Sequence, residues 1–168
     1  MFYIIIFINI FLYALRFIVG QNYLVKNFAL YPSNEFFTFF TCNFIHSDFE
    51  HLCMNMVMLF MIMQILKYFN KSHLLIIYLV GGIFSSFAYY FTMTSLGYYN
   101  FILLGASGAI SALFGFASIV LRQPGFLIAI AISSIISIIF FHNVAWQAHI
   151  FGAIFGIIYA YILRFRLF

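Results

Sequence analysis

The chain has 168 residues, of which 67% are hydrophobic, 23% aromatic and only 6% charged, and its formal net charge is +4. A soluble domain carries about 25% charged residues, so this composition excludes a water-soluble globular protein, a nucleic-acid-binding protein and a disordered chain. The sequence therefore predicts an all-α membrane protein whose outer surface contacts lipid.

Six apolar stretches follow one another, each approaching the roughly 20 residues of a membrane-spanning helix. Their predicted bounds are about 2–19, 51–66, 74–93, 103–121, 126–141 and 146–163. The first stretch lacks a basic start and a small-residue cleavage site, which favours a retained helix over a removed signal peptide. No repeat or second domain is visible, so residues 1–168 are predicted to form a single membrane domain.

Charge placement predicts how the helices are oriented. On a six-span layout the basic residues after spans two, four and six share one side: Lys67, Lys71, Arg122, Arg164 and Arg166. The acidic residues lie on the other side, together with Lys26: Glu35, Asp48 and Glu50. Cytoplasmic loops carry an excess of Lys and Arg, so both termini are predicted to face the cytoplasm from a cell (inner or plasma) membrane.

Polar residues gather toward the predicted external side of the membrane. They include Asn55, Ser107 and four of the five histidines: His46, His51, His142 and His149. Polar and ionisable groups at membrane depth are costly and indicate a functional site by default. We therefore expect the chemistry of this protein to lie near that face.

Ser107 lies in the sequence Gly105-Ala106-Ser107-Gly108, at the predicted start of the fourth span. Small neighbours leave its hydroxyl accessible, and the first-turn N–H groups of a helix favour developing negative charge. The same pattern also occurs where membrane helices simply pack together. Ser107 by itself is thus either a nucleophile or a packing residue.

His149 lies at the external end of the sixth span, the level from which Ser107 enters the membrane. Small residues recur at a spacing of four along this span, and the fourth span carries a similar run: the two sets are Ala148, Gly152, Gly156 and Ala160, and Ser107, Ser111, Gly115 and Ser118. Such stripes let two helices approach closely. If they meet, His149 is within the reach that a general base needs to take the Ser107 proton.

His51 and Asn55 are four residues apart and share one helix face. Both can donate hydrogen bonds to a developing oxyanion, and one such donor is worth about 10²–10³ in rate. The alternative is that they only join neighbouring helices.

Two metal-dependent arrangements are alternatives to a serine site. One is a surface metal cluster of His46, Asp48, Glu50 and His51, although the histidine spacing is five rather than the four of zinc proteases. The other is a bis-histidine haem site at His51 and His149, which leaves the serine motif unexplained. We predict no metal and no cofactor.

Taken together, three motifs resemble the rhomboid family of intramembrane serine proteases, in its compact six-helix bacterial form. They are His46-(four residues)-His51-Leu52-x-x-Asn55, then Gly105-Ala106-Ser107-Gly108, then Ala148-His149-(two residues)-Gly152-(three residues)-Gly156, and the resemblance extends from about Phe36 to Arg166. It implies a six-transmembrane-helix rhomboid-like bundle.

The resemblance also implies a role for each motif residue. Ser107 would be the nucleophile and His149 the general base, and His51, Asn55 and the Ser107 backbone N–H would form the oxyanion hole. Structural support would come from the remaining motif residues: His46, Gly105, Gly108, Gly152 and Gly156. The substrates would be single-span transmembrane proteins, cleaved at a site that opens to the external side.

The sequence departs from many rhomboids at three places. Phe37 and Thr38 stand where a Trp-Arg pair is common, Ser111 replaces an aromatic residue, and Ile62 and Leu66 replace a Gly and a Glu. The Ser111 change bears on how firmly His149 is held. Two other functions therefore stay open: a catalytically silent rhomboid-like protein that binds membrane helices, and a small transporter or haem-binding bundle.

Overall fold

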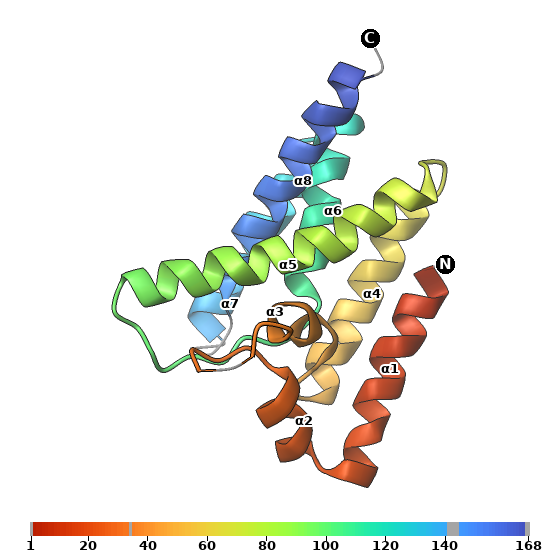
Figure 1. Cartoon of the computed structure of the whole chain (residues 1–168). Helices are drawn as coiled ribbons and strands as arrows, with labels where there is room; N and C mark the ends of the chain where they lie inside the picture. Colours follow the sequence, from red (N-terminus) through yellow and green to blue (C-terminus); the bar gives the residue numbers. More distant parts are fainter. Residues whose placement is uncertain (1, 34, 141–144, 167–168) are drawn as a thin grey trace.

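The computed structural model describes residues 2–33, 35–140 and 145–166 (Figure 1). Over this part the chain is helical, with one short 3₁₀ helix, η1, and no strand. The elements are α1 (Phe2–Val19), α2 (Gln21–Phe28), α3 (Thr38–Thr41), η1 (Cys42–Phe44), α4 (Phe49–Ile65), α5 (Lys71–Ser95), α6 (Ser107–Val120), α7 (Gly125–Phe140) and α8 (Trp146–Arg166). The predicted all-α class is confirmed for the described residues.

A long helix lies at each of the six predicted stretches: α1 has the predicted bounds, and the other five helices differ from theirs by a few residues. The largest difference is at the fourth, which begins at Ser107 and not at residue 103. Leu103 is extended instead and exchanges two backbone hydrogen bonds of 2.9 Å with Leu30. Gly105 follows with φ of +111°, a conformation that a helix cannot contain. Phe141 and His142, a predicted span end and a predicted external histidine, lie outside the described residues.

Two of the described helices are long and apolar enough to cross a membrane by themselves, namely Lys71–Ser95 and the Trp146–Leu163 part of α8. Four others are apolar but shorter: Tyr3–Val19, Phe49–Ile65, Ser107–Val120 and Gly125–Ile135. Large apolar side chains such as Phe7, Phe91 and Ile158 are exposed on the outer helices. The number of spans remains a prediction.

Helix α6 is the centre of the bundle. Every residue from Gly108 to Ser118 is buried, and α6 contacts α4, α5, α7 and α8. Figure 1 shows α1 and α4 on one side of α6 and α7 with α8 on the other, while α5 crosses the bundle obliquely. The small side chains of α6 allow this close packing from several directions.

The closest packing joins α6 to α8, the two helices that carry the paired small-residue stripes. A Cβ atom added to Gly152 would strike the carbonyl oxygen of Gly108, and one added to Gly156 would strike that of Ala112. Gly115 of α6 approaches the Ala153 carbonyl in the same way. The glycines are thus required because the two backbones touch.

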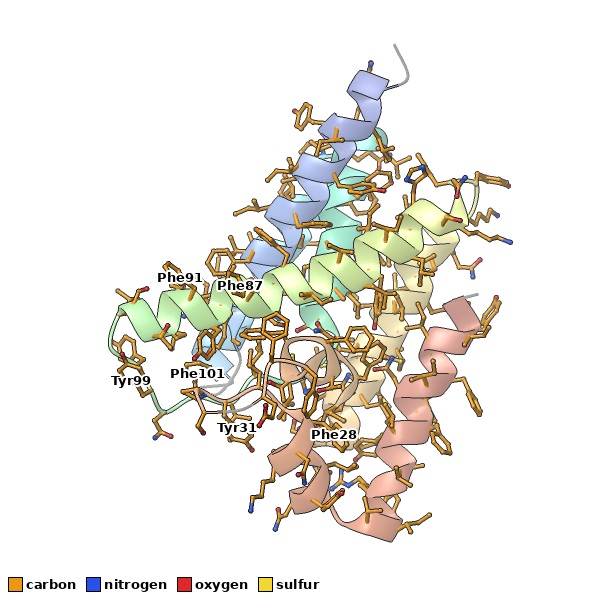
Figure 2. The ribbon with its side chains drawn as sticks, viewed as in Figure 1. Phe28, Tyr31, Phe87, Phe91, Tyr99 and Phe101 are labelled. Atoms are coloured by element: carbon orange, nitrogen blue, oxygen red, sulfur yellow. The ribbon has the colours of Figure 1, made fainter. Side chains whose placement is uncertain are left out.

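An aromatic cluster holds the segment that leads into α6. Figure 2 shows Phe87 and Phe91 on the second half of α5, and Tyr99 and Phe101 on the segment that follows it. The Phe101 ring packs edge-on against Tyr89 of α5 at a centroid distance of 5.3 Å, a favourable geometry for aromatic pairs. This contact anchors the chain a few residues before Ser107.

Candidate active site

The side chains of Ser107 and His149 are in direct contact. Ser107 is the first residue of α6 and His149 lies in the first turn of α8. The distance from His149 Nε2 to Ser107 Oγ is 2.9 Å, which is hydrogen-bonding distance and the reach that a general base requires. His149 is buried and Ser107 is partly buried. The pair therefore has the geometry of a nucleophile next to its base.

Ser85 of α5 braces this pair, although it carries no sequence motif of its own. Its hydroxyl donates a hydrogen bond of 2.6 Å to the carbonyl of Ala148, the residue before His149. It also lies against Gly108, the residue after Ser107. The run Gly81-Gly82-x-x-Ser85-Ser86 is a small-residue pattern of the kind seen on α6 and α8, and it is the signal that could have identified α5 as the third helix of the site.

The turn before Ser107 has a defined shape. The Gly105 N–H donates to the Cys42 carbonyl at 2.9 Å, and Gly105 has φ of +111°. Ala106 is the N-cap of α6, and its carbonyl accepts the first helical hydrogen bond, from Ile110. The N–H groups of the first turn, including that of Ser107, consequently have no acceptor within the helix. They are available to a negative charge at this point.

His51 and Asn55 of α4 lie over the same turn. A Cβ atom on Gly105 would lie 2.6 Å from His51 Cε1, 2.7 Å from His51 Nε2 and 3.7 Å from Asn55 Nδ2. Asn55 is 6% exposed, and its Nδ2 has no hydrogen-bond partner among the described residues. Leaving a buried amide donor without a partner costs about 1–3 kcal/mol of stability. A ligand that accepts hydrogen bonds at this position would remove that cost.

The segment before α4 supports His51 from the other side. His46 is 2% exposed, and its ring packs edge-on against that of His51 at a centroid distance of 5.1 Å. Burial lowers the pKa of His46 to about 3, so its ring is neutral at pH 7. The Gln21 side chain donates to the carbonyls of His46 and Ser47, at 3.3 and 3.1 Å.

Asp48 is the N-cap of α4 and accepts a 2.7 Å hydrogen bond from the backbone N–H of His51. The Ser47 hydroxyl donates to the same carboxylate at 2.6 Å. This hydroxyl, more than the backbone N–H, holds the pKa of Asp48 below its ordinary value, against a smaller opposing effect of burial. The carboxylate is therefore ionised at pH 7 and caps the helix.

Most of the predicted site residues lie together in the structure. Ser107, His149, His51, Asn55 and Gly105 meet at one end of the bundle, with His46 behind His51. Gly108, Gly152 and Gly156 lie between α6 and α8. Ser111 is buried one turn after Ser107, with its Cβ 3.3 Å from the place of a Cβ on Gly152.

The surface metal cluster considered as an alternative receives no ligand set from the described residues. They contain no group of three or more His, Cys, Asp or Glu side chains arranged to hold a metal ion. His51, His46 and Asp48 are close together, but they are engaged in ring packing and helix capping.

Comparison with known protein families matches residues 33–166 to the rhomboid domain. A search of curated proteins finds no match. The family match covers well over half of the 168 residues and includes every helix from α3 to α8. It confirms the resemblance first seen in the three motifs. The chain belongs to the rhomboid family and is a helical membrane protein.

Proposed function

We propose that this rhomboid is an intramembrane serine endopeptidase in which Ser107 is the nucleophile and His149 the general base. The observation that carries the proposal is the 2.9 Å contact between His149 Nε2 and Ser107 Oγ. Rhomboids typically act on transmembrane proteins within the lipid bilayer, and a serine–histidine pair is suited to acyl transfer.

In the first step Ser107 Oγ bonds to the carbonyl carbon of the scissile peptide while its proton passes to His149 Nε2. The carbonyl electron pair moves to oxygen, and the resulting oxyanion accepts hydrogen bonds from Asn55, His51 and the Ser107 N–H. The intermediate then expels the amine, which takes the proton from His149. Water repeats the sequence on the acyl-enzyme and releases the second product.

His149 has no carboxylate behind it in this scheme. The only acidic residues of the chain are Glu35, Asp48 and Glu50, and none is on α8. Close packing of α8 on α6, together with the Ser85 hydrogen bond, takes the orienting role that a carboxylate has in a serine–histidine–aspartate triad.

Topology and substrates complete the proposal. We infer six spans with both termini in the cytoplasm of a cell membrane, from the distribution of Lys and Arg. The proposed catalytic end then opens to the external side. Substrates are single-span membrane proteins whose helices unwind at small residues, because Ser107 needs an extended backbone to attack.

A fluorophosphonate probe tests the proposal without a known substrate, because it reacts only with an activated serine. We expect labelling of the wild type in detergent, none of Ser107→Ala, and strongly reduced labelling of His149→Ala. Ser118→Ala is the matched control, since Ser118 is a buried serine of the same helix that bonds to the Gly115 carbonyl. Equal labelling of wild type and Ser107→Ala would refute the dyad.

A folded wild type that is not labelled and does not cleave a model transmembrane substrate would favour the catalytically silent alternative, a rhomboid that binds membrane helices. Ser111 supports this silent alternative, because it stands where many rhomboids have an aromatic residue near the catalytic histidine. A Soret band in the purified protein would instead indicate the haem-binding bundle.

A further inference from the structure

A chain of three polar side chains ends at His51. The Ser47 hydroxyl lies 2.6 Å from Asp48 Oδ2 and 3.2 Å from His51 Nδ1. Asp48 also accepts the backbone N–H of His51 at 2.7 Å. The other edge of the ring, with Cε1 and Nε2, faces the Gly105 turn. The two nitrogens of His51 thus have different neighbours.

The number of available protons decides how this chain is connected. An ionised carboxylate only accepts hydrogen bonds, and a serine hydroxyl has one proton to donate. The short contact to Asp48 takes that proton. Ser47 Oγ can then only accept from His51, so His51 Nδ1 must carry a proton. In the neutral ring Nε2 is consequently a bare acceptor, which cannot stabilise an oxyanion.

The surroundings of His51 contain few other charges. His46 packs on the ring and is neutral at pH 7. Arg16 of α1 reaches the Ser47 carbonyl at 3.5 Å, Glu50 precedes His51 on the same helix, and His149 of α8 is at the same site. The segment 103–120, which contains α6, has no Asp, Glu, His, Lys, Arg, Cys or Tyr and so brings no titratable side chain to the ring.

We propose that Ser47 and Asp48 are positioning residues that keep a proton on His51 Nδ1, so that Nε2 donates to the oxyanion only from the imidazolium form. The inference rests on the proposed protease function. The second proton comes from solvent before Ser107 attacks, and it stays on Nε2 while the Ser107 proton passes separately to His149. The imidazolium then faces a carboxylate, through Ser47, on one side and the oxyanion on the other.

The protonation site can be measured directly by long-range ¹H–¹⁵N spectra of histidine-labelled protein in bicelles, with His51→Gln used to assign the signal. In the neutral wild-type ring we expect the proton on Nδ1. In Asp48→Asn the amide can donate to Ser47, whose hydroxyl then donates to His51 Nδ1. The proton should therefore move to Nε2. Asparagine caps helices as well as aspartate does, so α4 is preserved.

Two further variants complete the test. Ser47→Ala removes the Oγ atom that accepts from His51 Nδ1. The neutral ring should then no longer prefer to carry its proton on Nδ1. Glu50→Gln removes the same charge as Asp48→Asn at an exposed neighbouring position and should leave the wild-type spectrum unchanged. A neutral wild-type ring protonated on Nε2, or an unchanged proton position in both Asp48→Asn and Ser47→Ala, would overturn the proposal. Neither result depends on whether Ser107 reacts with the fluorophosphonate.

Cleavage of a model substrate supplies a second readout. The wild-type rate should fall as pH rises through the titration of the His51 imidazolium, because the neutral ring has no proton on Nε2. Asp48→Asn keeps an Nε2 proton on the neutral ring, so this decrease should disappear, with a maximum about 10-fold lower because a neutral donor is weaker than a charged one. A decrease that persists unchanged over the same pH range in Asp48→Asn contradicts the proposal.

Discussion

The two sides of the candidate site are held in different ways. On one side α6 and α8 touch backbone to backbone, so that the carbonyls of Gly108 and Ala112 occupy the places where side chains of Gly152 and Gly156 would begin. On the other side His51 is held by hydrogen bonds and ring packing at the start of α4, with Ser47 and Asp48 exposed.

This difference separates stability from chemistry. Interiors are close-packed, so an added methyl group between two touching backbones forces the helices apart. In an exposed hydrogen-bond network, one side chain can be replaced without moving a helix. We therefore expect variants of the α6–α8 contact to lose the folded protein, and variants around His51 to lose rate while the fold persists.

Gly156→Ala should have the largest effect. Its Cβ would strike the Ala112 carbonyl oxygen and lie 2.7 Å from the Phe116 nitrogen. We expect a loss of at least about 1–3 kcal/mol in the free energy of unfolding, together with loss of fluorophosphonate labelling. Gly125→Ala is the matched control, because no atom lies within 4 Å of its Cβ position. Thermal unfolding in detergent measures both, and equal stabilities would show that the α6–α8 contact is looser than described.

Gly105→Ala should come next and should act on rate. The added Cβ would lie 2.6 Å from the His51 ring and would displace it, which we expect to lower the cleavage rate by about 10²–10³, the value of one lost oxyanion donor. Gly97→Ala is the control for backbone strain, since Gly97 also has a positive φ, +80°, but open space around it. A similar rate loss in both variants would assign the effect to strain alone.

Asn55→Ala removes the unpartnered buried amide and should leave the protein folded, because that amide nitrogen stabilises no described contact. We expect the cleavage rate to fall by about 10², with little change in KM. Unfolding of this variant, detected by size-exclusion chromatography and thermal melting, would favour a structural role for Asn55.

Acidification should act on stability, through His46. The folded protein keeps His46 neutral down to a pKa of about 3, whereas in the unfolded chain the ring takes up a proton near its ordinary pKa of 6.5. The stability is therefore complete above pH 6.5 and decreases as pH falls from 6.5 toward 3. The wild-type Tm should fall more between pH 7 and 4 than that of His46→Gln. Parallel Tm curves would indicate that His46 does not contribute.

Much of the α6–α8 side could be predicted because its signals are local. The small-residue stripes of both helices are visible in the chain, and close helix contact is their usual consequence. Ser85 was missed because its partner, the Ala148 carbonyl, lies 63 residues away and has no sequence signature. Hydropathy predicts a start of the fourth span at residue 103, and not at Ser107, because hydropathy does not register the positive φ of Gly105.

The His51 side was predicted less completely. The sequence predicts that His51 and Asn55 share one helix face, but it also allows Asp48 to belong to a metal cluster. In the structure Asp48 caps α4. An Asp directly before an apolar helical run is a known N-cap signal, so this role was available from the sequence. The direction of the Ser47 hydrogen bond was not, because it depends on distances between side chains.

The sequence alone determined that this protein is helical, apolar and suited to a membrane. Composition and the lengths of the apolar stretches are local properties of the chain, and they do not depend on how the helices pack. It also contained the residue types for a serine–histidine pair. Only the tertiary structure decided that Ser107 and His149, 42 residues apart, lie 2.9 Å from each other. That distance follows from the contact of two helix backbones, and such contacts are set by how the whole bundle packs.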